Sequence, residues 1–181
     1  MSKLCNDKNN NLLTIRTGGR DLYTPYDDYS SIYKASSIHS NGSVTVQVLF
    51  LDSVDPGTKA GVVIRNSLAS NGSYDSNTAA GYAAVVASPR DEVSFLWDSN
   101  GDGRLDSMSN IPKATPPLYA RLDVSGTQFT GYFSSNGVQW TQIGNAVVIP
   151  TRLQVSDVGV LVSSHGGFIN STAVFANLTI C

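Results

Sequence analysis

The sequence is poor in charged side chains, and almost all of its acid is aspartate. Charged residues make up 14% of the 181-residue chain, well below the usual quarter. Glu92 is the only glutamate among the 14 acidic residues. Helices favour glutamate, whereas loops and ion sites use aspartate. The imbalance therefore predicts few helices and many loops.

Long apolar runs and a surplus of basic residues are also missing. No stretch of 18 consecutive apolar residues occurs, so no helical membrane span is expected. The formal net charge is −2, which gives no basic surface for nucleic acid. Residues 1–11 lack the apolar core of a signal peptide and are interpreted as a polar lead-in or a cloning-derived tail. Residues 12–181 are expected to form one domain with a sizeable core.

Cysteine is scarce, and its placement is informative. The two cysteines, Cys5 and Cys181, stand at opposite ends of the chain. A disulfide between them would tie a first strand to a last one, whereas the alternative is two unrelated thiols. The abundance of Ser, Thr, Asn and Gly suits a secreted or cell-surface protein. Asn-x-Ser/Thr sequons, whose number is close to chance, occur at Asn41, Asn71, Asn170 and Asn177.

Short β-strand patterns recur along the chain, and no segment keeps the 3.6-residue apolar period of a helix. Runs rich in Val, Ile, Thr, Tyr and Phe alternate with turn residues. Asn136-Gly137 lies between two such runs and predicts a tight hairpin. About ten to twelve such strands predict an all-β fold, an antiparallel two-sheet sandwich. The predicted strands cover 43–51, 60–66, 79–88, 92–98, 118–125, 128–135, 140–149, 157–164 and 171–180.

An acidic loop, DSNGDGRLD, follows the strand pattern at 92–98. Oxygen-bearing side chains at alternate positions, with a Gly for the bend, are typical of Ca²⁺-binding loops. An EF-hand is excluded, because Ser109 stands where the bidentate acid belongs; the loop is more similar to those of dockerins and thrombospondin-type repeats. The alternative is a hairpin loop held by side-chain-to-backbone hydrogen bonds. The predicted ligands are Asp98, Asn100, Asp102, the Arg104 carbonyl and Asp106, completed from Asp91 or Asp123.

Several stretches together resemble a known family. They are AGVVIRNSL, GYAAVV, VSFLWDSNGDGRLD, YARLDVSGTQFTGYFSSNGVQWTQIG and DVGVLVSSH, with GGRDLYTPYDDYSSIY near the start. They resemble concanavalin A-like jelly-roll domains attached to secreted glycoside hydrolases, which are related to laminin-G-like and regulation-of-enolase-like sandwiches. The resemblance covers residues 16–180. It implies a jelly roll with an accessory role in glycan recognition, similar to carbohydrate-binding module family 66, and it names no sugar.

Sugar recognition needs an aromatic ring for stacking and planar polar groups that fork onto hydroxyl pairs. The structural alternatives are a core position for Trp97 and Tyr82, a buried Asp partner for Arg65, and a plain loop position for His165. Trp140 is expected to pack across its own hairpin. The candidate ligand contacts are Asp21, Tyr23, Tyr26, Asp28, Arg65, Tyr82, Trp97 and His165, with Asp27 in the same polar–aromatic cluster.

Catalysis is not expected from this sequence. Glucanases of the resembled fold use a Glu-x-Asp-x-Glu strand, which a single glutamate cannot supply. The adjacent pair Asp27 and Asp28 would point to opposite faces of a strand. No Gly-x-Ser-x-Gly elbow is present.

The sequence therefore predicts a secreted, non-catalytic, calcium-stabilised carbohydrate-binding module. Its expected partner is a polysaccharide or another glycan, and its expected neighbour in a parent protein is a glycoside hydrolase domain. Two alternatives stay open. One is a surface adhesion or structural module that contacts protein, and the other is a glycan-active enzyme that uses Asp residues.

Overall fold

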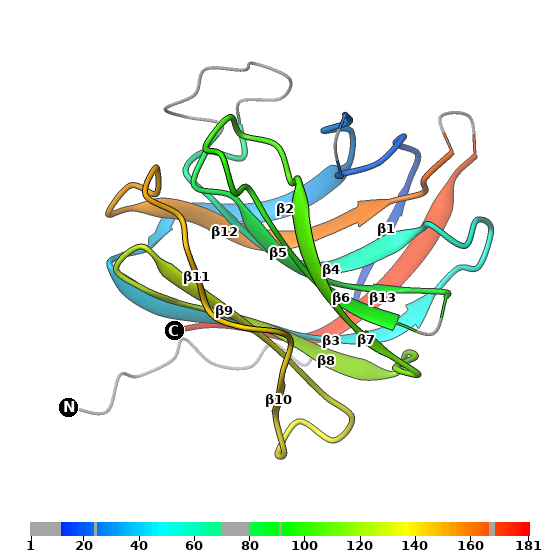
Figure 1. Cartoon of the computed structure of the whole chain (residues 1–181). Coiled ribbons are helices and arrows are strands. Elements are labelled where there is room, and N and C mark those ends of the chain that lie inside the picture. The colour runs from blue at the N-terminus through cyan, green and yellow to red at the C-terminus, as the bar shows by residue number, and fades with distance from the viewer. Residues whose placement is uncertain (1–11, 24, 70–79, 91, 167–168) are drawn as a thin grey trace.

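Two antiparallel β-sheets packed face to face make up the protein (Figure 1). The computed structural model describes residues 12–23, 25–69, 80–90, 92–166 and 169–181. No residue in these ranges is helical, and none of them belongs to a helix that could cross a membrane. The predicted all-β sandwich is confirmed.

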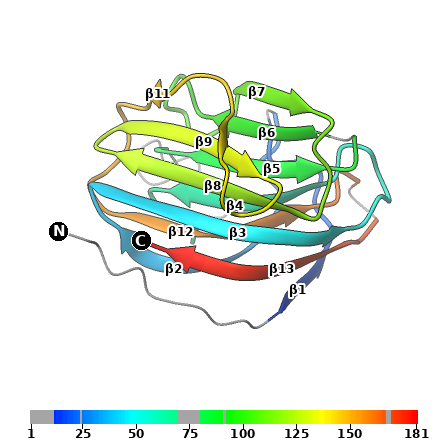
Figure 2. The same ribbon diagram turned by 90° about the horizontal axis from the view of Figure 1, so that it is seen from below.

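Each sheet collects strands that are far apart in the sequence. Figure 2 shows one sheet from below, with β13, β3, β8 and β9 side by side. That seven-stranded sheet has the order β1 (Leu13–Thr17), β13 (Ser171–Ile180), β3 (Asn41–Leu51), β8 (Leu118–Ser125), β9 (Gln128–Ser134) and β10 (Thr141–Gln142), with β11 (Val147–Val148) also on β9. The six-stranded sheet has the order β2 (Ser30–Ile38), β12 (Ser156–Ser163), β4 (Lys59–Arg65), β5 (Ala83–Ser88), β6 (Glu92–Trp97) and β7 (Ser107–Pro112).

The main core lies between the sheets and is built by alternation along the strands. On β8, Leu118, Ala120, Leu122 and Val124 are buried, while the residues between them are half-buried. Successive side chains of a strand point to opposite faces, so the inward set packs and the outward set faces solvent. β8 therefore presents a polar row on the outer face of the seven-stranded sheet.

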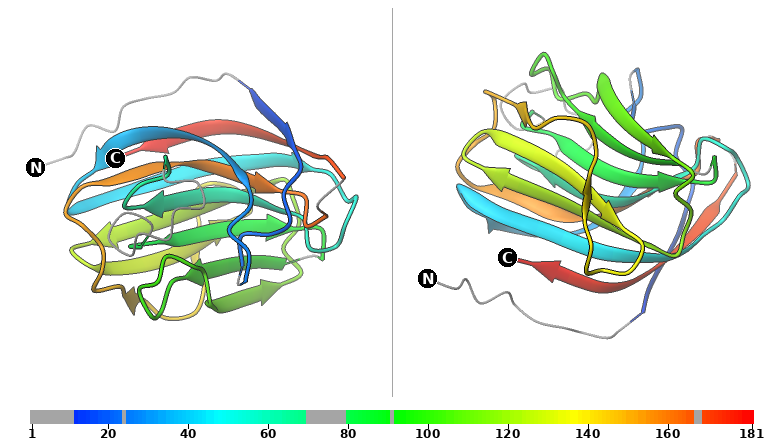
Figure 3. Two further views of the ribbon diagram at one scale, coloured as in Figure 1. Left: turned by 90° about the horizontal axis from the view of Figure 1, so that it is seen from above. Right: turned by 60° about the horizontal axis from the view of Figure 1, so that its bottom comes forward.

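The six-stranded sheet carries a second, smaller apolar cluster on its outer face. Val63, Tyr82, Val86 and Leu96 of this cluster pack with Leu22, which lies outside the sheet. Figure 3, left, shows the segment between β1 and β2 running across the strands of this sheet. Strands β4, β5 and β12 are buried along almost their whole length for this reason.

Most predicted strands are confirmed, and two match to the residue, namely 118–125 and 171–180. The predicted strand 140–149 is wrong. It is divided into β10 and β11 by a turn in which Gly144 has a φ of 64°. Strand β5 begins at Ala83 rather than 79, after Gly81 with a φ of 64°. Strands β1, β2 and β7 lie outside the predicted strand ranges.

The chain ends beside β3. The Cys181 amide donates to the Ser43 carbonyl at 2.9 Å, and the Ser43 amide donates back at 3.0 Å. Cys5 lies outside the described residues, so the predicted disulfide stays a prediction. Of the sequons, Asn41 and Asn170 are exposed, Asn71 lies outside the described residues, and the Asn177 side-chain amide donates to Gln47 at 2.9 Å.

Candidate functional site

A depression of about 300 Å³ lies on the outer face of the six-stranded sheet. Its floor comes from β5, β6 and β7, and its wall comes from the loops that hold Asp21, Gly57 and His165. The predicted ligand residues Asp21, Tyr23 and His165 therefore meet at one place, although they are far apart in the sequence. The loop between β1 and β2, called the covering loop, carries Asp21 and Tyr23 and places them beside His165.

The wall is a network of charged side chains. The Lys59 ammonium donates to Asp21 Oδ1 at 2.9 Å and to the Gly57 carbonyl at 3.0 Å. His165 Nε2 lies 3.5 Å from Asp21 Oδ2, and its Nδ1 lies 2.8 Å from Asp55 Oδ1. The imidazole thus stands between two carboxylates, and these contacts fix the orientation of the ring.

Asp55 is set by its own loop. The Gly57 amide donates to Asp55 Oδ1 at 2.6 Å and is the main cause that holds the pKa of Asp55 below its ordinary value. Burial opposes this shift, and the hydrogen bond to His165 adds to it. The Asp55 carboxylate therefore stays charged to a lower pH than an ordinary aspartate.

The floor offers hydroxyl and amide groups beside a small apolar strip. Ser88 and Ser94 are buried, while Asn110 is exposed. Met108 is 43% exposed. Tyr23 donates its hydroxyl to the Asp106 carbonyl at 2.6 Å. Burial raises the pKa of Tyr23, and repulsion by Asp106 adds to this effect.

Tyr26 and Asp28 lie on the exposed part of the covering loop. Asp28 pairs with Arg20 at 3.1 Å, with 46% and 61% of the two side chains exposed. The same guanidinium stands 5.0 Å from the centre of the Tyr26 ring. Neither residue lines the depression, so the predicted cluster is divided between a buried and an exposed part.

Arg65 and Tyr82 are not surface contacts, and their predicted roles in binding are wrong. Arg65 does leave β4 on the outer face, but the covering loop buries it against Asp27 at 2.8 Å, with 4% of each side chain exposed. The guanidinium also donates to Tyr29 and Gly103 and lies 4.3 Å above the Tyr82 ring. Burial lowers the pKa of Arg65, but Tyr29, Tyr82 and Asp27 together raise it above its ordinary value.

Trp97 belongs to the core side of the six-stranded sheet. Its ring lies 5.2 Å from that of Phe95, and both pack in the cluster between the sheets. β6 turns this position toward the core, but the side chain is only half-buried. Its predicted role as a ligand contact stays a prediction.

The acidic loop is closed by hydrogen bonds from its own backbone. Asp98, 1% exposed, accepts from the Gly101 and Gly103 amides at 2.7 and 2.8 Å. The next three ligand candidates accept in the same way. Asn100 accepts from Asp102 N, Asp102 from Arg104 N, and Asp106 from Ser99 N, each at 2.9 Å. This is the arrangement that the alternative interpretation predicts.

The carboxylates of the loop do not form a metal-binding group as they lie here. Among the described residues, no group of three or more His, Cys, Asp or Glu side chains could hold a metal ion. Asp123, one suggested source of a further oxygen, is on β8 of the other sheet and pairs with Arg121; Asp91 lies outside the described residues. Burial raises the pKa of Asp98, and Asp102 and Asp106 add to this against the backbone amides. The calcium site stays a prediction.

Sequence reasoning missed a second group of polar and aromatic residues, on the outer face of the seven-stranded sheet. Arg121 and Asp123 on β8, Tyr132 on β9 and Trp140 before β10 lie together there. Trp140 contacts the β8 residues Tyr119 and Arg121, so it packs on β8 rather than only across its own hairpin. The signal was present, because Arg121 and Tyr132 lie in the predicted strands 118–125 and 128–135, where the hairpin register pairs them.

No family model and no curated protein matches the chain. Solved structures do match in fold. A functionally unknown protein from Saccharomyces cerevisiae has 14% identity and a TM-score of 0.67, over 100% of this chain and 92% of that one. The GH43 protein BlXynB from Bacillus licheniformis has 16% identity and a TM-score of 0.71, over 93% of this chain and 32% of that one.

An alginate lyase of polysaccharide lyase family 7, A1-II′, is also similar in structure. It has 12% identity and a TM-score of 0.62, over 100% of this chain and 84% of that one. At such identities the likeness shows the fold alone, a jelly-roll β-sandwich. The expected concanavalin A-like architecture fits these neighbours. The relation to carbohydrate-binding module family 66 stays a prediction.

Proposed function

We propose that this chain is a non-catalytic carbohydrate-binding module that holds a polysaccharide in the depression on the six-stranded sheet. One observation carries the proposal. Asp21, Lys59 and His165 form an interlocked wall above a floor with the hydroxyls of Ser88 and Ser94. Side chains fixed in this way can bond sugar hydroxyls without losing further conformational freedom.

Two of the structures with a similar fold belong, by name, to glycan-acting proteins. This supports a polysaccharide as the class of ligand. The exposed Met108 beside the polar floor supports it as well, because sugars combine apolar ring faces with hydroxyl edges. A secreted or cell-surface location, with a glycoside hydrolase domain nearby, belongs to the same proposal.

Affinity electrophoresis tests the proposed site directly. The wild type is run in gels that contain xylan, galactan, β-glucan, fructan or alginate, beside the variants Asn110→Ala and His165→Ala. We expect at least one polysaccharide to slow the wild type, and each variant to weaken that interaction about tenfold. Asp28→Ala, on the exposed part of the loop that also carries Asp21, is the matched control. Migration unaffected by any polysaccharide overturns the function, and unaltered retention of both variants overturns the site.

An enzyme remains the alternative because Asp21 and Glu92 line the same depression. Two carboxyl groups across a glycosidic bond are the usual requirement for hydrolysis. Asp21, however, is held by Lys59 and by the Leu22 amide at 2.7 Å, which suits a structural role better than proton transfer. Release of reducing ends or of unsaturated sugars from the same polysaccharides, lost in Glu92→Gln, would favour the enzyme.

A further inference from the structure

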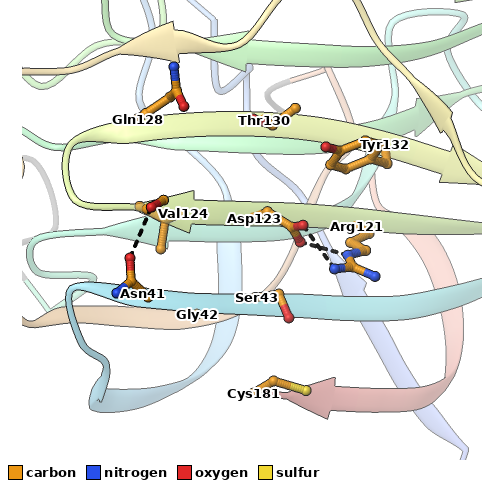
Figure 4. Close-up of a pocket in the computed structure, with 11 residues that line it drawn as sticks. Asn41, Gly42, Ser43, Arg121, Asp123, Val124, Gln128, Thr130, Tyr132 and Cys181 are labelled. Atoms are coloured by element: carbon orange, nitrogen blue, oxygen red, sulfur yellow. Dashed lines mark hydrogen bonds and ion pairs between the residues drawn. The ribbon is translucent and has the colours of Figure 1, made fainter. Parts of the chain in front are cut away.

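The outer face of the seven-stranded sheet holds a separate depression of about 350 Å³ (Figure 4). It lies over β3, β8 and β9, whose antiparallel register places outward side chains in rows. Neighbouring strands are about 4.8 Å apart, so a row across three strands extends on the order of 10 Å. Two adjacent rows consist of Ser43, Asp123 and Thr130, and of Thr45, Arg121 and Tyr132.

Aromatic rings border this face on the side of the hairpin that contains Asn136 and Gly137. The Arg121 guanidinium lies 5.9 Å from the centre of the Tyr132 ring and 5.5 Å from that of Trp140. Tyr119 meets Trp140 edge-on at 6.4 Å. Gly137 fits closely over Tyr119, because a Cβ there would come within 3.0 Å of the ring. The rings are therefore held in place while Tyr132 and Trp140 stay partly exposed.

Arg121 and Asp123 form a paired fork near Tyr132, as Figure 4 shows. Arg121 Nε donates to Asp123 Oδ1 at 2.6 Å, and Arg121 Nη2 donates to Asp123 Oδ2 at 2.8 Å. The pair uses two of the five N–H donors of the guanidinium, so others remain for a ligand. About a third of each side chain is exposed, 35% and 30%.

The charges on this face favour uncharged sugars over anionic ones. Asp123 neutralises Arg121, and the other outward groups in the two rows are hydroxyls and a phenol. An anionic sugar would find no unpaired cation in these rows and would meet the Asp123 carboxylate. An uncharged sugar would stack on the rings and exchange hydrogen bonds with the fork.

We propose that this face is a second carbohydrate-binding site, which takes an uncharged polysaccharide and excludes polyuronates. The proposal rests on the proposed function for its class of ligand, but its residues belong to the opposite sheet. The two sites are therefore separable by mutation.

Tryptophan fluorescence tests the second site without interference from the first. The chain has two tryptophans, and Trp97→Phe leaves Trp140 as the reporter while keeping an aromatic ring against Phe95. This variant is titrated with uncharged xylan, galactan and β-glucan oligosaccharides, and with alginate oligosaccharides as the anionic comparison. We expect a saturable change in emission with an uncharged sugar and none with alginate. Adding Tyr132→Ala or Arg121→Ala should weaken that binding about tenfold.

The matched control is Tyr33→Ala, which removes a ring with 38% exposure from β2 on the other sheet. It should leave the titration unchanged, as should Asn110→Ala in the first depression. Circular dichroism checks that each variant is folded.

Four results overturn one or both proposals. Retention in gels without any change in Trp140 emission removes the second site and leaves the proposed function intact. An emission change that Tyr132→Ala does not weaken also removes it. A response to alginate removes the charge selection. Wild-type protein that binds no sugar in either assay removes both proposals together.

Discussion

Two adjacent aspartates show how much the surroundings of a residue decide its role. Asp27 is buried against Arg65, with 4% of each side chain exposed. Asp28 points outward and pairs with the exposed Arg20. A buried charge that loses its partner is costly, whereas an exposed ion pair contributes little. The covering loop thus depends on one of these two carboxylates.

We expect Asp27→Ala to lower the free energy of unfolding by about 3–5 kcal/mol, because it leaves the buried Arg65 charge without its carboxylate. Asp28→Ala, the matched control, should cost less than about 1 kcal/mol. Urea unfolding monitored by circular dichroism measures both. Equal stability of the two variants would contradict the buried position of Asp27.

Asp55 should make the free energy of unfolding depend on pH in the acid range. Its pKa is lowered in the folded protein, so its contribution is full above the ordinary aspartate pKa and is lost as the pH falls through the folded value. We expect Asp55→Asn to be less stable than the wild type near pH 6, and the difference to shrink toward about pH 2. Asp52→Asn controls for the loss of one negative charge. A difference that stays constant with pH would argue against the Gly57 and His165 contacts.

At the scale of elements, the strands that the sequence did not reveal lie at the edges of the sheets. β1 ends one sheet, and β2 and β7 end the other. An edge strand packs on fewer neighbours, so its apolar alternation is weak; residues 32–36 of β2, for example, are all exposed. The inner strands β8 and β13 bury alternate residues, along all of β8 and the first half of β13, and were predicted with their bounds.

The candidate sites were predictable only where sequence neighbours stay together. Asp21 and Tyr23 were identified because they are close in sequence. That Arg65 and Tyr82 are buried depends on a loop from another part of the chain folding over the sheet. Arg121, Tyr132 and Trp140 meet through strand register and a turn. Such long-range placement leaves little trace in a single sequence.

The loop at 98–106 is predicted to bind Ca²⁺ and thereby stabilise the protein. Asp98, Asp102 and Asp106 lie along this loop, and the raised pKa of Asp98 reflects burial first and then repulsion by the other two carboxylates. A cation would relieve that repulsion. We expect millimolar Ca²⁺ to raise the melting temperature relative to chelator, with about 2.7 kcal/mol gained at a hundredfold excess over Kd. Mg²⁺ is the control ion. Equal melting temperatures would reject the calcium site and leave the backbone hydrogen bonds as the support of the loop.

At the scale of the whole molecule, the C-terminal residue is fastened to β3 through Ser43. A bridge from Cys5 would close a loop around nearly the entire chain, which restricts the unfolded state. We expect Cys5→Ser, like a reducing agent, to lower the free energy of unfolding by up to about 5 kcal/mol. Thiol titration of the unfolded, non-reduced protein would count the free cysteines. Two reactive thiols would show that the bridge does not form.

The two depressions lie on opposite outer faces of one sandwich, with a single core between them. Two ligands bound at these sites would be separated by the protein, so each copy would cross-link two polysaccharide chains. When the protein is mixed with a long uncharged polysaccharide, the viscosity or turbidity of the solution should rise near the stoichiometric ratio. An excess of protein should reverse that rise. A module with a single binding site would bind the polysaccharide without cross-linking it.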